Sequence, residues 1–253
     1  MKIFIPSKGR HSYKQARSML LFDNFGVEYT IVIEKEEEIF YSNAFPKAEL
    51  LILPESGRGI GYSRDFLLRK ARAEGHDWIW IFDDDVKNFG KKVGKRIVKM
   101  APAEFFRETD RILKEELPNH KIGIAGALYS IHTIHAQVSH SINRRFWSNI
   151  LINTKTGIDY DPSLRVWEDM DFFINHLSNG WKSLCFNQFC VEMEIGGFHN
   201  GTRRQEGGCG PDYLKGAKIK YSAIIAKRYP EYLKVYRDKN GKLQSRIFYK
   251  KFK

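Results

Sequence analysis

The sequence has few cysteines and no long apolar run. Its 253 residues include only Cys185, Cys190 and Cys209, and no two of them form a Cys-x-x-Cys pair. This excludes a disulfide framework and a zinc site of that type, and it predicts a reducing compartment. No stretch of 18 apolar residues occurs, so no membrane-spanning helix is expected. The first residues are interrupted at Pro6 and lack the apolar stretch of a signal peptide, which predicts a cytoplasmic protein.

Acidic residues are scarce in the last fifth of the chain. Residues 201–253 contain 15 of the 42 Lys and Arg but only 4 of the 30 Asp and Glu, a net charge of +11, whereas the first 200 residues carry +1. A second cationic cluster contains no acid and consists of Lys87, Lys91, Lys92, Lys95, Arg96 and Lys99. Concentrated positive charge attracts nucleic acid or anionic membrane, although a solvated surface is the alternative explanation.

The hydrophobic pattern predicts an α/β fold. Hydrophobic residues make up 42% of the chain, enough for a sizeable core. Apolar runs predict strands at residues 2–5, 29–33, 50–53, 78–82, 122–128, 146–152 and 184–195. Helical periods and stop signals predict helices at 13–25, 61–73, 102–117, 168–178 and 214–228. Strands alternating with helices through residue 130 predict a mostly parallel sheet, and the second half is mixed. The glycine-rich stretch 196–210, where the charge balance also changes, predicts a boundary between a first domain (1–200) and a basic, aromatic extension (201–253).

Two loops in the first half suit phosphate. Ligands of open α/β sheets bind at the carboxyl ends of the strands. There the first strand is followed by Pro6-Ser7-Lys8-Gly9-Arg10, whose amides, hydroxyl and cations suit a nucleotide, with a plain turn as the alternative. The glycine-rich segment 57–65 runs into a helix, where Arg64 and the first amides could receive a diphosphate; a helix-start loop with a solvated Arg64 is the alternative. Tyr62 stands where a dinucleotide fingerprint needs its third glycine.

Three carboxylates at the end of a strand give the strongest signal. Trp78-Ile79-Trp80-Ile81-Phe82 runs directly into Asp83, Asp84 and Asp85. Their mutual repulsion is relieved by a divalent cation, and oxygen ligands suit magnesium or manganese. An acidic capping turn is the alternative.

Two later segments could complete a site. Glu168 and Asp169 stand at the predicted start of a helix, where a carboxylate either caps the helix or takes a proton from an acceptor hydroxyl. His199 lies alone among glycines after the last predicted strand. It is a solvated loop residue or, beside a carboxylate-bound metal, a ligand.

The order of these motifs resembles that of GT-A-type nucleotide-sugar glycosyltransferases, over residues 1–200. The first-strand loop, the helix start Gly61-Tyr62-Ser63-Arg64-Asp65 (with Asp65 in place of the usual Asn), a DxD motif, a Glu-Asp motif and a late histidine follow in that order. The resemblance implies a GT-A-like domain and manganese or magnesium as cofactor. It implies that Asp85, Asp83 and His199 hold the metal. It implies donor contacts from Pro6, Ser7, Lys8, Arg10, Gly61, Arg64, Asp83 and Asp84.

The same resemblance implies a catalytic pair, Glu168 and Asp169. In an inverting enzyme Asp169 would be the general base, and in a retaining enzyme it would position the acceptor. The implied metal and donor contacts are chemically coherent, because a cation and basic side chains stabilise the charge that develops on a diphosphate leaving group.

The basic, aromatic C-terminus is similar to that of phage glycosyltransferases that modify hydroxymethylated pyrimidines in DNA, such as the TET-associated glycosyltransferases. This implies a UDP-linked donor and hydroxymethylcytosine in DNA as acceptor, with residues 201–253 binding the acceptor. Three other functions stay open: transfer to a polysaccharide, lipid or protein, a metal-dependent nuclease, and a binding module without catalysis. The sequence does not fix the oligomeric state.

Overall fold

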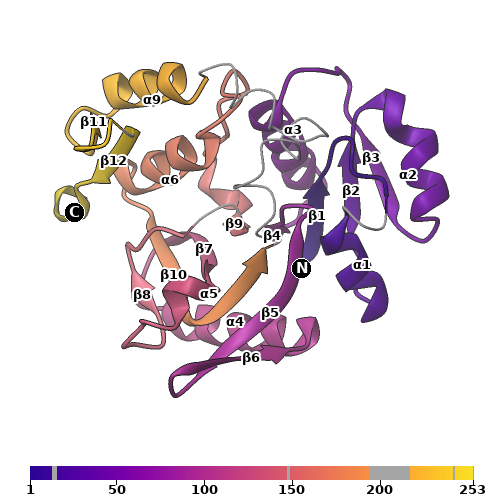
Figure 1. Cartoon of the computed structure of the whole chain (residues 1–253), viewed down its shortest axis with the longest axis horizontal. Helices are drawn as coiled ribbons and strands as arrows, with labels where there is room; N and C mark the ends of the chain where they lie inside the picture. The colour runs from indigo at the N-terminus through magenta and orange to yellow at the C-terminus, as the bar shows by residue number, and fades with distance from the viewer. Residues whose placement is uncertain (13–15, 147–148, 194–216, 242, 253) are drawn as a thin grey trace.

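The structure is a computed structural model that describes all residues except 13–15, 147–148, 194–216, 242 and 253. Its centre is a ten-stranded sheet with the order β3-β2-β1-β4-β9-β7-β10-β5-β6, and β8 pairs with β10 (Figure 1). The strands are β1 (Lys2–Pro6), β2 (Thr30–Ile33), β3 (Glu49–Ile52), β4 (Trp78–Ile81), β5 (Val86–Val93), β6 (Arg96–Met100), β7 (Ile122–Tyr129), β8 (Ser141–Ile142), β9 (Ile150–Asn153) and β10 (Lys182–Met193). The helices of the first 193 residues are α1 (Arg17–Asn24), α2 (Glu38–Ala44), α3 (Ile60–Ala73), α4 (Pro102–Glu116), α5 (Ser130–Thr133) and α6 (Glu168–Ser178).

The sheet is mixed, with a predominant direction. Neighbours β3, β2, β1 and β4 are parallel, as are β7 and β10. The antiparallel pairings reverse only β5, β8 and β9, so the other seven strands share one direction. This confirms the predicted α/β fold with a mixed, mostly parallel sheet.

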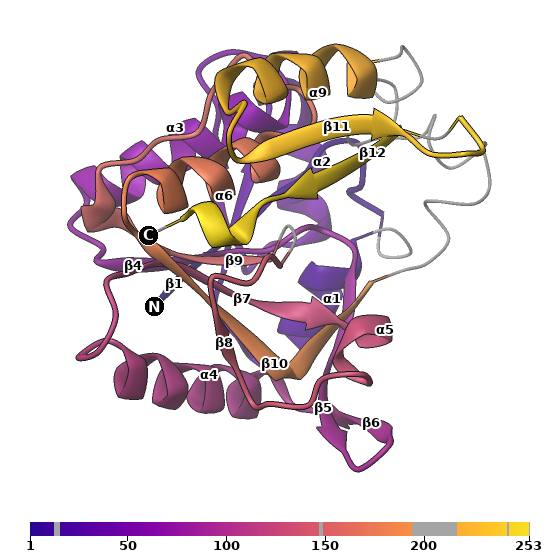
Figure 2. The same cartoon turned by 90° about the vertical axis from the view of Figure 1, so that its left-hand side faces the viewer.

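Helices cover both faces of the central part of the sheet, which explains why β2, β4, β7 and β9 are largely apolar on both faces. Along β4, Ile79 and Ile81 face a core cluster that contains residues of α3 and α6, while Trp80 faces a second cluster with residues of α1 and α4. Figure 2 shows α4 on one side of the sheet and α3 and α6 on the other. The central strands are therefore buried and their polar groups lie at the strand ends, whereas β5 and β6 at the edge carry exposed basic side chains.

The predicted elements agree best where an apolar period is long. Helices expected at 61–73, 102–117 and 168–178 are found as α3, α4 and α6. The strand expected at 146–152 begins only at Ile150, because Phe146 instead packs where Gly126 of β7 leaves room for its ring. The cationic cluster 87–99 is a hairpin of β5 and β6 that we did not predict, closed by a turn in which Gly94 has a φ of +59°.

The C-terminal segment packs on α6. It forms α9 (Ala217–Arg228), β11 (Leu233–Arg237), β12 (Leu243–Ile247) and the 3-10 helix η4 (Tyr249–Lys251). Ile225, Leu233 and Phe252 belong to the core cluster that contains Phe172 of α6. Arg228 also donates to Asp161 and Asp171, each at 2.6 Å. The expected helix 214–228 is thus found over α9, with residues 214–216 outside the described residues, and the C-terminal segment rests on the helix that begins with Glu168. In the part of the chain that the structure describes, no helix is long and apolar enough to cross a membrane.

Candidate active site

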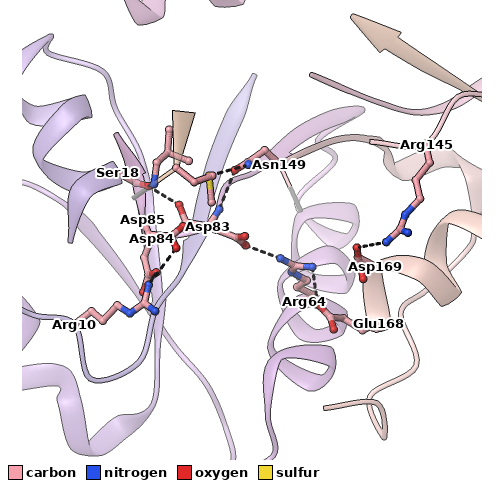
Figure 3. Close-up of polar contacts among 12 residues, drawn as sticks. Arg10, Ser18, Arg64, Asp83, Asp84, Asp85, Arg145, Asn149, Glu168 and Asp169 are labelled. Carbon is pink, nitrogen blue, oxygen red and sulfur yellow. Dashed lines mark hydrogen bonds and ion pairs between the residues drawn. The ribbon is translucent and has the colours of Figure 1, made fainter. Parts of the chain in front are cut away.

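The three aspartates that follow β4 point in different directions (Figure 3). Asp83 accepts a hydrogen bond from Arg64 Nη2 at 2.7 Å. Asp84 is buried and accepts from the Ser7 hydroxyl at 2.7 Å and from Arg10 Nη1. Burial raises the pKa of Asp84, against the opposing effects of Arg10 and Ser7. Two of the three carboxylates are therefore held by protein donors on opposite sides of the turn.

Asp85 has the most distant counter-charge of the three aspartates. Its side chain is 30% exposed, and among the described residues it pairs with Arg10, whose Nη1 lies 3.7 Å from Oδ2. The other oxygen, Oδ1, is buried and has no hydrogen-bond partner among the described residues. Burial and the charges of Asp83 and Asp84 raise the pKa of Asp85 to about 7. This carboxylate would be stabilised by an additional cation.

The backbone of the aspartate turn is fixed by α1. The Ser18 hydroxyl donates to the carbonyl of Asp83 and accepts from the amide of Val86, at 2.9 Å for the second bond. The Ser18 amide donates to the carbonyl of Asp84 at 3.1 Å. Asn149 Oδ1 accepts from the Asp83 amide at 3.1 Å. Ser18 and Asn149 have no sequence signal of their own, and we did not predict either.

The aspartate turn offers a metal ion one carboxylate oxygen that has no other described partner, Oδ1 of Asp85. Among the residues with described positions, no three His, Cys, Asp or Glu side chains are arranged to hold a metal, and His199 lies outside that set. Magnesium is commonly held by one or two carboxylates together with substrate phosphates and water. The unpartnered Asp85 Oδ1 fits such a role, whereas Asp83 and Asp84 are already engaged by arginines.

The β1 loop borders the aspartate turn. Pro6 ends β1, and Ser7 bonds both Asp84 and the Tyr41 hydroxyl, which lies 2.7 Å away. Lys8 pairs with Glu34 at 2.5 Å and Arg10 with Asp84. The structure thus brings Ser7, Arg10, Asp84 and Asp85 together, and it places Lys8 on Glu34.

Arg64 and Gly61 are packed against other parts of the protein, whereas a loop that binds phosphate must be accessible to it. The Arg64 side chain is 2% exposed and donates to Asp83 and, through Nη1, to Glu168 Oε1 at 2.7 Å. The alternative of a solvated Arg64 is therefore wrong. A Cβ on Gly61 would lie 2.3 Å from the carbonyl oxygen of Leu164, so this glycine is required by close packing.

Glu168 and Asp169 occupy the first turn of α6. Glu168 is buried against Arg64, and burial and the neighbouring Asp169 raise its pKa to about 7 although Arg64 opposes the rise. Asp169 is 19% exposed and accepts from Arg145 Nη2 at 3.2 Å. Because Asp169 is the more accessible of the two, it is the better placed to meet a substrate hydroxyl.

A family comparison covers most of the chain. The sequence model described as TET-Associated Glycosyltransferase matches residues 1–197, a range that contains the site residues named above except His199. No curated protein matches the sequence.

Two solved structures are distantly similar. A mannose-1-phosphate geranyltransferase from Thermus thermophilus has a TM-score of 0.34 and 8% identity, over 74% of this chain and 57% of its own. A protein from Desulfovibrio desulfuricans, described as a nucleotide-diphospho-sugar transferase, has a TM-score of 0.39 and 10% identity, over 90% of this chain and 99% of its own. Both TM-scores are low, so neither likeness bears on activity.

Proposed function

The chain belongs to the TET-associated glycosyltransferase family, and from this premise we propose that it transfers a sugar from a nucleotide-sugar donor, with a divalent cation, to 5-hydroxymethyl pyrimidine in DNA. Membership makes it a nucleotide-sugar glycosyltransferase. The cation, a UDP-linked donor and hydroxymethylcytosine in DNA as acceptor are the proposal. The observation that carries it is the partly exposed Asp85, whose Oδ1 has no partner among the described residues and whose turn Arg64 joins to the first turn of α6.

We name two sides of the site. The donor side consists of the β1 loop (6–10) and the aspartate turn (83–85), and the acceptor side consists of the first turn of α6 (168–171) and the C-terminal segment (217–252). On the donor side, Asp85 would hold the cation, joined by His199 if the family resemblance extends to it. When bound, the cation would stabilise negative charge on the departing diphosphate.

The chain's own residues account for the remaining chemistry. Arg10 and Lys8 lie at the carboxyl end of β1, where a diphosphate would exchange with their present carboxylate partners. In a single displacement, the acceptor oxygen bonds to the anomeric carbon while the bond from that carbon to the phosphate oxygen breaks. Asp169 then takes the proton that the hydroxymethyl group loses. A proton acceptor must be reachable by substrate, which the 19% exposure of Asp169 permits.

Charge and aromatic side chains support DNA as the acceptor. Tyr236 and Tyr249 are 43% and 39% exposed on a segment rich in lysine and arginine. Phosphates bind such cations, and an unstacked base can stack on an aromatic ring. Tyr249 lies beside Arg145. Burial raises the pKa of Tyr249, and the charge of Arg145 and a hydrogen bond with its backbone partly oppose this rise. Since Arg145 bonds Asp169, the C-terminal segment approaches the proposed base.

A screen of nucleotide sugars tests the proposal. Nucleoside diphosphate release is measured with manganese and with chelator, on duplexes that carry hydroxymethylcytosine or unmodified cytosine. We expect metal-dependent release that increases on the modified duplex and declines with salt. Equal failure on both duplexes, with efficient transfer to a saccharide or lipid, would exclude DNA as acceptor. Strand cleavage without sugar transfer would favour a nuclease.

A further inference from the structure

We infer that Arg64 is a positioning residue that fixes the aspartate turn relative to the first turn of α6, and that it does not bind the donor diphosphate. The inference rests on the proposed division of the site into donor and acceptor sides. It departs from the role that a helix-start arginine suggests in sequence, which is to face phosphate.

The geometry of the guanidinium is the first argument. Nη2 donates to Asp83 and Nη1 donates to Glu168, both at 2.7 Å. The planar fork of arginine suits two such bonds in fixed directions, which a lysine ammonium cannot reproduce. The side chain is 2% exposed, and its Nε–H is buried without a hydrogen-bond partner among the described residues. The group therefore lies buried between two carboxylates (Figure 3).

The backbone around Arg64 is adapted to this bridge. Gly61, one turn earlier in α3, lets the segment 161–164 approach so closely that an added Cβ would lie 2.3 Å from Leu164 O and 2.7 Å from Asp161 O. That segment leads to Trp167, whose φ of +66° and ψ of 14° are left-handed. Non-glycine residues adopt this conformation rarely, and it persists only where surrounding contacts hold it. The chain thus makes an unfavourable turn immediately before the residue that Arg64 binds.

Loss of the Arg64 bridge would affect both sides of the site. Asp83 and Glu168 are separated by 85 positions in sequence and come from opposite sides of the site. Removing a buried arginine leaves its partners as uncompensated charges, which then move or take up protons. The two sides would lose their fixed separation, and small displacements of reacting groups can lower turnover by about 10²-fold.

Nucleotide affinity and turnover separate this role from phosphate binding. Arg64→Lys and Arg64→Met are compared with wild type by calorimetry with UDP and with GDP, each with manganese. We expect affinity within about threefold of wild type, because Arg64 does not touch phosphate under this inference. Turnover should fall by about 10²-fold in Arg64→Met and less in Arg64→Lys. A parallel loss of nucleotide affinity and turnover would overturn the inference.

A matched control lies on the same helix. Arg72 donates to Thr154 O at 3.0 Å and pairs with Asp159 at 2.8 Å, two turns from Arg64 and outside the site. Arg72→Met should lower stability while turnover changes less than threefold. If Arg72→Met lowers turnover as much as Arg64→Met, Arg64 acts only by general stabilisation, and the inference fails.

A denaturation cycle tests the bridge without any activity. Urea unfolding is measured for Arg64→Met, Glu168→Gln and the double variant. Because Glu168→Gln removes the charge that Arg64→Met leaves unpaired, the double variant should be at least as stable as Arg64→Met. Additive losses would overturn the bridge. If wild type turns over no nucleotide sugar, the proposed function fails, and this cycle still decides whether Arg64 joins the two carboxylates.

Discussion

The donor side and the acceptor side are held by different kinds of interaction. On the donor side, the β1 loop and the aspartate turn follow neighbouring parallel strands, and hydrogen bonds that the Ser7 and Ser18 hydroxyls donate fix the aspartate turn. On the acceptor side, α6 depends on ion pairs with distant segments, through Arg64, Arg145 and Arg228. The backbone of the donor side is therefore set by the sheet, and Arg10 and Arg64 only select the directions of its aspartates, whereas the acceptor side is held by ion pairs that salt, pH and substitution can disturb separately.

The largest effect is expected on the acceptor side, from Asp169→Asn. The amide keeps the size of the side chain but cannot accept the proton, so turnover should fall by about 10²–10⁴-fold. The Michaelis constant for the nucleotide sugar should change little, because the donor side is untouched. Steady-state kinetics measures both. Turnover within about twofold of wild type would show that Asp169 only caps the helix.

On the donor side, Asp85→Ala should lower metal-dependent transfer by about 10²–10³-fold, since it removes electrostatic support for the leaving group. The fold should be retained, because Asp85 Oδ1 has no hydrogen-bond partner among the described residues and its Oδ2 lies 3.7 Å from Arg10, beyond hydrogen-bond distance. A transfer assay across a manganese titration measures the first effect, and circular dichroism measures the second. The control is Asp77→Ala, an exposed carboxylate just before β4 that pairs with Lys155. Normal turnover of Asp85→Ala at limiting manganese would remove the metal assignment.

The buried His176 of α6 should make the free energy of unfolding depend on pH. His176 is fully buried, and burial lowers its pKa to about 4. The unfolded chain therefore binds more protons between about pH 6.5 and 4, and stability falls as the pH falls through this window, by about 3 kcal/mol. Urea unfolding of His176→Gln should lack this slope. His140→Gln, at a more exposed histidine, should keep it.

Asp85 and Glu168 in the site should change the free energy of unfolding with pH in the opposite direction to His176. Burial raises the pKa values of Asp85 and Glu168 to about 7, so the folded state binds more protons than the unfolded state from there down to about pH 4.5. These two groups therefore gain stability as the pH falls. Glu168→Gln should make the loss of stability on acidification steeper than in wild type. An unchanged pH profile would contradict the raised pKa of Glu168.

The smallest effect is expected from the β5–β6 hairpin. Lys95, Arg96 and Lys99 are exposed, and no ion pair to them is found among the described residues. Changing all three to Gln should weaken DNA binding and reduce the slope of its salt dependence by about 0.9 for each phosphate that the hairpin no longer neutralises. The control changes Arg107, Arg111 and Lys114 of α4 to Gln, on the opposite face from α6 (Figure 2). Equal effects would show that net charge alone matters.

Local patterns in the sequence predicted most of the fold and much of the candidate site. Three carboxylates after an apolar strand, and an Asn-Gly stop after α6, are signals within a few residues. The directions of the aspartates were not predictable, because Arg10 and Arg64 select them from elsewhere in the chain. The bridge from Arg64 to Glu168 spans 104 positions and likewise leaves no local trace. The β5–β6 hairpin was missed because its lysines obscured the alternation of its apolar residues.

The position of β6 affects how the hairpin variants must be handled. In the described part of the sheet, β6 is the last strand and pairs only with β5, so one side of its backbone is free to pair with another molecule. Positive side chains on an edge strand discourage such pairing between copies. Arg96 and Lys99, both on β6, thus protect the protein from self-association whatever they bind. A variant that neutralises them should be examined by light scattering before its weaker DNA affinity is attributed to the DNA.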